Sequence, residues 1–273
     1  MDLSQILEIT SATDPGMVRS HNEDSIASDP ANGLVVLADG MGGYNAGEVA
    51  SGMATTVITT EVAQVLTKVQ PYEIDDRNEL AATRIVREQI LKANTSIYQA
   101  AQSQPQYAGM GTTLIVCLFY DNKVMVGHLG DSRVYMMRDG KFSQVTRDHS
   151  LLQEQIDSGL ITAEQAKTAA HKHLVTKALG IDWTVEPEIH EYEVKVGDIY
   201  LLCSDGLCDM VSDEDIGMTL SMLGANLKLA TQQLVQMAND NGGRDNVSVI
   251  LVRVLKEYPA ARGAMSKFFA WLK

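Results

Sequence analysis

Short apolar runs and stretches of helical periodicity alternate along the chain and predict strands and helices in groups. Residues 7–12 (LEITSA) and 33–38 (GLVVLA) are strand-like, and the second run is typical of a buried strand. Helical spacing follows over residues 45–66 and 79–102. In the first predicted helix the apolar positions that recur on one side are Val49, Met53, Val57 and Val65.

The pattern changes after Gly109 to a series of short strands. Four strand-like runs are separated by turn residues, and they cover 112–120, 123–129, 133–138 and 141–146. The pair Asp139-Gly140 between the last two runs is a strong hairpin signal, because glycine tolerates a positive φ. These runs predict a meander, so we expect an antiparallel sheet here.

The remaining segments return to mixed helices and strands. We expect a polar helical segment, two strands, two helices and a last strand, over residues 150–171, 185–194, 198–203, 213–220, 225–238 and 246–255. Helices that arrive in groups between antiparallel runs favour an α+β layered fold over a doubly wound parallel sheet. Residues 257–273 form a C-terminal tail, for which packing against the body is favoured over membrane contact.

Composition narrows the class of protein. The 273 residues include 22 basic and 35 acidic side chains, a net charge of −13, which argues against nucleic acid or anionic membrane as partner. No apolar run reaches the roughly 20 residues that span a bilayer. The acidic N-terminus shows no secretion signal, and the odd number of cysteines (Cys117, Cys203 and Cys208) is typical of free thiols, so we expect a cytoplasmic protein.

Four aspartates lie beside glycines at the ends of apolar strand-like runs, namely Asp39, Asp131, Asp205 and Asp245. Any one such residue is usually a turn residue. Four of them can converge at one edge of a layered sheet, where their mutual repulsion favours divalent cations. Mg²⁺ and Mn²⁺ prefer oxygen ligands. Spacing alone does not decide between turns and a metal site.

Six motifs in order resemble one protein family. They are DPGMVRSHNEDS (14–25), VVLADGMGG (35–43), GMGTT (109–113), GDSR (130–133), LCSDGL (202–207) and GRDNV (243–247). This series resembles the bacterial metal-dependent protein phosphatases of the protein phosphatase 2C type, known as the PPM family. The resemblance covers about residues 5–256.

The resemblance implies a four-layer α-β-β-α sandwich with two antiparallel sheets. It implies one phosphatase domain over residues 1–256, with a helical flap insert over about 148–181. It also implies two Mn²⁺ or Mg²⁺ ions, with a third ion in bacterial members. The ligands implied are Asp39 as the bridging residue, Asp205 and Asp245 for the first ion, Glu23 and the Gly40 carbonyl for the second, and Asp131 with Asp205 for the third. Asp24 and Asn246 are expected to support these ligands from outside the coordination sphere.

The implied reaction is hydrolysis of phosphoserine or phosphothreonine in proteins by a metal-activated water. Arg19 matches the family's phosphate-binding arginine, and its planar guanidinium suits two phosphoryl oxygens. Arg19 and Asp39 are the expected catalytic residues. Met41 stands where many eukaryotic members have a histidine proposed as general acid, and methionine donates no proton. His21 and Tyr44 lie in nearby loops, and the general acid stays unassigned.

Other functions remain as alternatives. The chain could be an inactive module that binds phosphoproteins, although it keeps every expected ligand, or a hydrolase of small phosphate esters. In the flap, His171 and His173 are better explained as a solvated helix end than as a metal pair, and the flap is expected to influence substrate choice. The implied partners are phosphorylated proteins and a bacterial serine/threonine kinase, and a monomer is expected.

Overall fold

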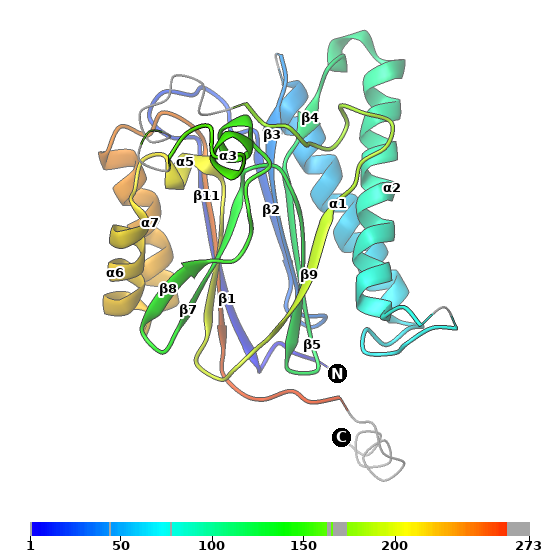
Figure 1. The fold of residues 1–273 in the computed structure, drawn as a ribbon, viewed down its shortest axis with the longest axis vertical. Coiled ribbons are helices and arrows are strands. Elements are labelled where there is room, and N and C mark those ends of the chain that lie inside the picture. Colours follow the sequence, from blue (N-terminus) through cyan, green and yellow to red (C-terminus); the bar gives the residue numbers. More distant parts are fainter. Residues whose placement is uncertain (1, 44, 77, 163–164, 166–173, 261–273) are drawn as a thin grey trace.

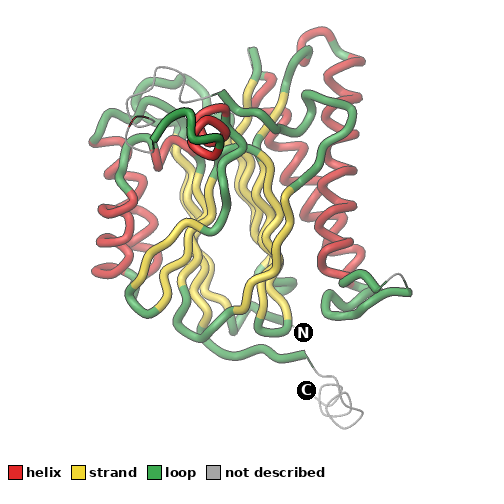
Figure 2. Tube along the Cα trace, viewed as in Figure 1, coloured by secondary structure: helices red, strands yellow, loops and turns green. Residues whose placement is uncertain are grey.

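Two antiparallel sheets lie face to face in the computed structural model, and helices cover both outer faces (Figures 1 and 2). The structure describes residues 2–43, 45–76, 78–162, 165 and 174–260. The first sheet has the strand order β1 (Leu7–Asp14), β11 (Val247–Val254), β10 (Ile199–Cys203), β7 (Arg133–Arg138) and β8 (Lys141–Gln144). The second has the order β2 (Asp24–Asp29), β3 (Leu34–Met41), β5 (Leu114–Tyr120), β6 (Lys123–Leu129) and β9 (Glu188–Glu193), and β4 (Gly111–Thr112) pairs with β3.

The helices form the two outer layers. α1 (Ala46–Leu66) and α2 (Ala81–Ser103) pack on the second sheet, whereas α6 (Asp213–Leu223) and α7 (Leu227–Asp240) pack on the first. A 3₁₀ turn, Pro105–Tyr107, follows α2, and two short helices, α3 (Leu151–Asp157) and α5 (Asp205–Cys208), lie at one end of the sheets (Figure 1). The expected four-layer sandwich is therefore confirmed.

Side-chain alternation along the strands decides which layer each residue contacts. In β3, Leu34, Val36 and Ala38 pack against α1 and α2, whereas Val35 and Leu37 pack between the two sheets. The residues of β10 and β11 divide in the same way, between the inter-sheet core and the layer of α6 and α7. Strands buried on both faces explain why these segments are continuous apolar runs.

The buried face of α1 is rotated by one residue from the predicted face. The four predicted positions are only partly buried, and the fully buried stripe is Ala46, Ala50, Ala54, Ile58 and Val62. Small side chains let the helix axis approach β3 closely, so the closest contacts come from alanines rather than from the larger valines. β2 was not predicted, because its sequence DSIASD carries little apolar signal.

The flap is held at both of its ends. A β-bridge joins Ser150 to Val175, and a second bridge joins Leu179 to Thr112 beside β4. Within the flap, Ser150 accepts a hydrogen bond from the Gln153 N–H and caps α3, which covers the first part of the predicted helical segment of 150–171. Residues 163–164 and 166–171 of that segment lie outside the described residues. The predicted His171 and His173 lie outside the described residues.

The beginning of the tail packs against the sandwich. Tyr258 is buried in the inter-sheet core, where its N–H donates to Asn122 and its hydroxyl donates to the Lys123 carbonyl. Residues 261–273 lie outside the described part of the chain. Within the described part, no helix combines the length and apolarity that a membrane crossing requires.

Candidate metal centre

Six acidic side chains gather at one end of the sandwich, because the strands that carry them end or begin there. Register pairing sets Asp24, the first residue of β2, directly opposite Asp39 near the end of β3. The other four acids flank strand ends: Glu23 precedes β2, Asp131 lies between β6 and β7, Asp205 follows β10, and Asp245 precedes β11. We call these six residues the acidic cluster.

Burial and neighbouring carboxylates raise the pKa values of Asp24, Asp39 and Asp131 in the acidic cluster. Burial raises the pKa of Asp39 well above its ordinary value, and the negative charges of Asp24 and Asp205 raise it further. Burial raises the pKa of Asp24 to about 7 despite a hydrogen bond from Ser204. Burial, followed by the charge of Asp205, raises the pKa of Asp131 to about 7. The protein alone therefore does not compensate the negative charge at this end.

Two glycines let the backbone approach Glu23 closely. A Cβ on Gly40 would lie 2.2 Å from the Gly47 carbonyl oxygen and 2.6 Å from that of Glu23. A Cβ on Gly47 would lie 2.9 Å from Glu23 Oε1. The Gly40 N–H donates to the Glu23 carbonyl at 3.1 Å. Any side chain at either glycine would thus push Glu23 out of place.

Asn246 ties the two metal-facing loops together. Its side-chain Oδ1 accepts the Glu23 N–H at 2.8 Å, and its amide group donates to the carbonyls of Pro15 and His21. Its backbone N–H donates to Asp245 Oδ1 at 2.9 Å. Through its side chain and its backbone N–H, Asn246 therefore links Glu23 and its loop to Asp245.

Ser204, Thr112 and Thr113 form hydrogen bonds with Asp24 or Asp39 of the acidic cluster. The sequence analysis assigned none of the three a role. Ser204 donates to Asp24 Oδ2 at 2.8 Å and accepts the Ser248 N–H at 3.0 Å. Thr113 Oγ1 accepts the Asp39 N–H, and Thr112 Oγ1 donates to the Asp39 carbonyl. All three residues belong to the motifs GMGTT and LCSDGL, which also contain glycines or an aspartate, so their place in these motifs could have pointed to them.

The donor set fits divalent cations. Asp24 Oδ1 is buried and has no hydrogen-bond partner among the described residues, although it carries a carboxylate charge and lies beside Asp39. A buried carboxylate oxygen without a partner is costly in free energy. Oxygen ligands in this number are what Mn²⁺ and Mg²⁺ bind. The residues present therefore match the ions that the sequence analysis expected.

Arg19 lies at the rim of the acidic cluster and contacts one of its members. Its Nη2 lies 2.7 Å from Asp245 Oδ2, and both side chains are substantially exposed. The hydrogen bond to Asp245 and the charge of that carboxylate raise the pKa of Arg19. The guanidinium is thus within reach of the cluster while its solvent-exposed edge stays accessible to an anion.

The described residues supply no evident proton donor beside the cluster. Met41 is the last residue of β3 and carries no acidic proton. His21 is exposed, and its backbone carbonyl accepts from the Asn246 amide. Tyr44 lies outside the described residues.

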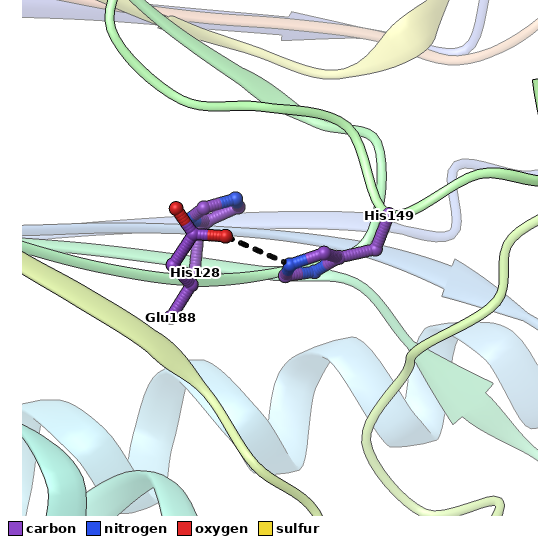
Figure 3. Close-up of side chains that lie close together, drawn as sticks. All are labelled: His128, His149 and Glu188. Atoms are coloured by element: carbon purple, nitrogen blue, oxygen red, sulfur yellow. Dashed lines mark hydrogen bonds and ion pairs between the residues drawn. The ribbon is translucent and has the colours of Figure 1, made fainter. Parts of the chain in front are cut away.

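A second group of ionisable side chains, His128, His149 and Glu188, lies in the second sheet and at the start of the flap (Figure 3). We call it the histidine cluster. The two imidazole rings stack with centroids 4.7 Å apart, and His149 Nε2 lies 3.3 Å from Glu188 Oε2. Sequence analysis did not find this cluster, because register pairing of β6 with β9 is what sets His128 opposite Glu188.

Hydrogen bonds fix the tautomers in the histidine cluster. The Gly130 N–H donates to His149 Nδ1 at 3.2 Å, so a neutral His149 carries its proton on Nε2 and donates it to Glu188. His128 Nε2 donates to the Arg147 carbonyl at 2.9 Å. A metal at His149 Nε2 would displace the proton that bonds Glu188. These residue types can bind metals. However, His128 Nε2 and both ring nitrogens of His149 already make hydrogen bonds, so the group is satisfied without an ion.

Comparison with known proteins identifies relatives along most of the chain. The family model described as protein phosphatase 2C matches residues 18–252. The serine/threonine protein phosphatase PstP of Mycobacterium tuberculosis is 35% identical over 267 residues, covering 96% of this chain and 48% of the relative. Protein phosphatase PhpP of Streptococcus pneumoniae is 35% identical over 256 residues, covering 92% of this chain and 99% of the relative. The chain thus spans about half of PstP and nearly all of PhpP.

Solved structures agree with these matches. The structure of the M. tuberculosis phosphatase PstP/Ppp superposes with a TM-score of 0.82 at 35% identity, covering 92% of this chain and 100% of the other. Stp1 of Staphylococcus aureus gives a TM-score of 0.82 at 34% identity, covering 94% and 98%. The PstP catalytic domain in complex with two manganese ions gives a TM-score of 0.79 at 35% identity, covering 92% and 99%.

Proposed function

This chain belongs to the protein phosphatase 2C family, and we propose that it is a metal-dependent protein serine/threonine phosphatase. The observation that carries the proposal is the acidic cluster, in which carboxylates raise one another's pKa and Asp24 Oδ1 has no partner among the described residues. Relatives named as serine/threonine phosphatases support the assignment, as does the PstP structure with two manganese ions.

We assign the ligands by their place in the acidic cluster. Asp39 would contribute to both ions, Asp205 and Asp245 to the first, Glu23 and the Gly40 carbonyl to the second, and Asp131 with Asp205 to a third. When bound, Mn²⁺ or Mg²⁺ would supply an activated water and neutralise phosphoryl charge. Asn246 holds Glu23 and Asp245 in register, and Ser204 orients Asp24.

Arg19 is proposed to bind the substrate phosphate. Its exposed guanidinium carries up to five N–H donors, and the contact with Asp245 uses only Nη2. The planar fork can donate to two phosphoryl oxygens while the Asp245 contact orients it.

The same reasoning leads to proposals for the substrates, the oligomeric state and the cellular location. We propose phosphorylated proteins as substrates, among them targets of a bacterial serine/threonine kinase, and a monomer that works in the cytoplasm. The three cysteines are free in this structure, which suits a reducing compartment. The flap begins at His149 and Ser150, close to the loop that carries Asp131, so it is placed to contact residues around the phosphoserine.

The test is hydrolysis of a phosphothreonine peptide and of p-nitrophenyl phosphate with Mn²⁺ and with EDTA, run beside small phosphate metabolites. A protein phosphatase hydrolyses the peptide only with the metal and prefers it to the metabolites. A preference for metabolites would favour the small-ester hydrolase, and binding of the peptide without hydrolysis would favour the inactive module.

A further inference from the structure

Two cysteine thiols lie on either side of Asp205. Cys203 is the last residue of β10 and Cys208 is the last residue of α5, and their Sγ atoms are 3.4 Å apart. Both thiols are free. Cys203 is fully buried, whereas Cys208 is partly exposed and so is accessible to a small oxidant.

The surroundings of Cys208 favour its thiolate form. Its pKa is lowered by the hydrogen bond from Cys203 and, against the effect of burial, by the positive charge of Arg133. Tyr135 adds a hydroxyl 3.6 Å from Cys208 Sγ. Cys203 is fully buried with its Sγ 3.4 Å from Cys208 Sγ, so it is placed as the second thiol of the pair. A thiolate is the form of cysteine that attacks peroxides.

We propose that Cys203 and Cys208 form a reversible disulfide when a hydroperoxide oxidises the protein. The Cys208 thiolate attacks the peroxide, giving a sulfenic acid and releasing hydroxide or alkoxide. The Cys203 sulfur then attacks the sulfenic sulfur, and the S–S bond forms as water leaves with the Cys203 proton. The two thiols lose two electrons to the peroxide, and a dithiol reductant restores them.

Bond formation must shorten the Sγ–Sγ separation from 3.4 Å to about 2.05 Å, so the segment between the cysteines has to move. That segment has little freedom. Its Ser204 hydroxyl binds Asp24 and the Ser248 N–H, and a Cβ on Gly206 would lie 2.0 Å from the Asn246 carbonyl oxygen. Asp205 lies in this segment, and its carbonyl accepts the Asp209 N–H at 2.8 Å, so closing the S–S bond strains the backbone that positions this acid.

The consequence for the enzyme rests on the proposed function. If Asp205 is a metal ligand, a disulfide that strains the segment carrying it weakens Mn²⁺ binding by roughly tenfold, in the range seen when a supporting contact of a metal site is lost. Peroxide would then switch the phosphatase off and a reductant would restore it.

The experiment treats the whole chain with hydrogen peroxide, denatures it in N-ethylmaleimide so that the buried thiols that remain are blocked, and measures the intact mass and the peptide map. We expect a loss of about 2 Da, one blocked cysteine (Cys117) and a 203–208 disulfide that dithiothreitol reverses. Cys208→Ser should lose the mass change, whereas Cys117→Ala, which removes the matched buried thiol of β5, should keep it. Oxygen addition alone, or a disulfide in Cys208→Ser, would overturn the proposed pairing.

The effect of the disulfide on Mn²⁺ affinity is measured separately, by Mn²⁺ titration of the oxidised and reduced protein. A disulfide without any change in Mn²⁺ affinity would refute the switch. A disulfide in a protein that hydrolyses no phosphopeptide even when reduced would refute the proposed function and leave the redox site standing. The two failures are therefore distinguishable.

Discussion

The acidic cluster and the histidine cluster both contain residue types that bind metals, but the pKa values of their carboxylates are shifted in opposite directions. In the acidic cluster, burial and like charges raise the pKa values of Asp24, Asp39 and Asp131. In the histidine cluster, burial would raise the pKa of Glu188, but the hydrogen bond from His190 and the charges of His128 and His149 lower it. In the first cluster, Arg19 pairs with Asp245 at the rim, but the charges around Asp24 and Asp39 are those of other carboxylates, whereas the second cluster contains its own partners.

This difference shows what separates a metal site from a polar group of the same composition. Ligand atoms within a few ångströms are not sufficient, because hydrogen bonds can already occupy their lone pairs and protons. Two observations separate the clusters. In the acidic cluster, Asp24 Oδ1 has no hydrogen-bond partner among the described residues, whereas in the histidine cluster the His149 Nε2 proton already bonds Glu188.

Asp39→Asn tests the acidic cluster with the largest expected effect. Loss of the bridging carboxylate should lower phosphopeptide turnover on the order of 10³-fold, because charge neutralisation at phosphorus depends on it. Without metal, the variant should be as stable as the parent or more so, since one repelling charge is gone. Steady-state kinetics and thermal unfolding in EDTA measure these two effects.

The matched control is Asp139→Asn, which makes the same chemical change in an exposed hairpin turn at φ 50° that asparagine tolerates. It should leave turnover unchanged. Turnover by Asp39→Asn at the parental rate would remove the basis for a metal-bridging role.

The second prediction concerns the pH dependence of folding stability, to which the acidic cluster and the histidine cluster contribute with opposite signs. In EDTA, Asp24 and Asp131 have folded pKa values of about 7 against ordinary values of 3.8, so the stability that their protonated forms contribute is lost as pH rises from about 4 to 7. Burial lowers the pKa values of His128 and His149 below 6.5, so their contribution is present above 6.5 and is lost as pH falls.

Metal reverses the first trend, because ions bind the ionised carboxylates. We therefore expect the Tm difference between Mn²⁺-saturated and EDTA-treated protein to grow from pH 5 to pH 7.5, by several degrees. Differential scanning fluorimetry at fixed ionic strength measures it. A Tm difference that stays constant or shrinks over this range would contradict the assignment of ionised Asp24 and Asp131 to the metal-bound form.

The sequence pattern pointed to Asp39, Asp131, Asp205 and Asp245, and the family resemblance added Glu23 and Asp24. The histidine cluster was missed for a physical reason. Asp39, Asp205 and Asp245 sit in short local motifs with glycines, and strand ends collect them at one edge of the layers. His128 and Glu188 are 60 positions apart and meet only because β6 and β9 pair in one particular register. Similarly, the polar β2 and the alanine face of α1 depend on neighbours supplied by the fold, which periodicity does not encode.

Arg19→Ala should have an intermediate effect, because Arg19 is proposed to bind phosphate and not metal. We expect kcat/KM for the phosphopeptide to fall roughly tenfold to a hundredfold, by loss of charge-assisted hydrogen bonds. Mn²⁺ affinity should not fall, since Asp245 loses a competing cation. Steady-state kinetics and Mn²⁺ titration give both readings.

Arg19→Lys refines this test, because it keeps the charge and loses the fork. It should recover only part of the activity. Arg244→Ala removes an exposed arginine beside Asp245 and serves as the control, with little expected change. Equal kinetics for Arg19→Ala and the parent would exclude the phosphate role.

The smallest expected effect belongs to His149→Phe, which keeps the ring stack with His128 but removes both hydrogen bonds of His149. The Gly130 N–H loses its acceptor and Glu188 loses a donor, so the free energy of unfolding should fall by about 1–3 kcal/mol in urea titrations. Mn²⁺ stoichiometry should stay the same, because the histidine cluster holds no ion in this interpretation. His190→Ala, at an exposed neighbour of Glu188, should cost less stability. A stoichiometry lower by one ion in His149→Phe would make the histidine cluster a metal site, and the contrast between the two clusters would then fail.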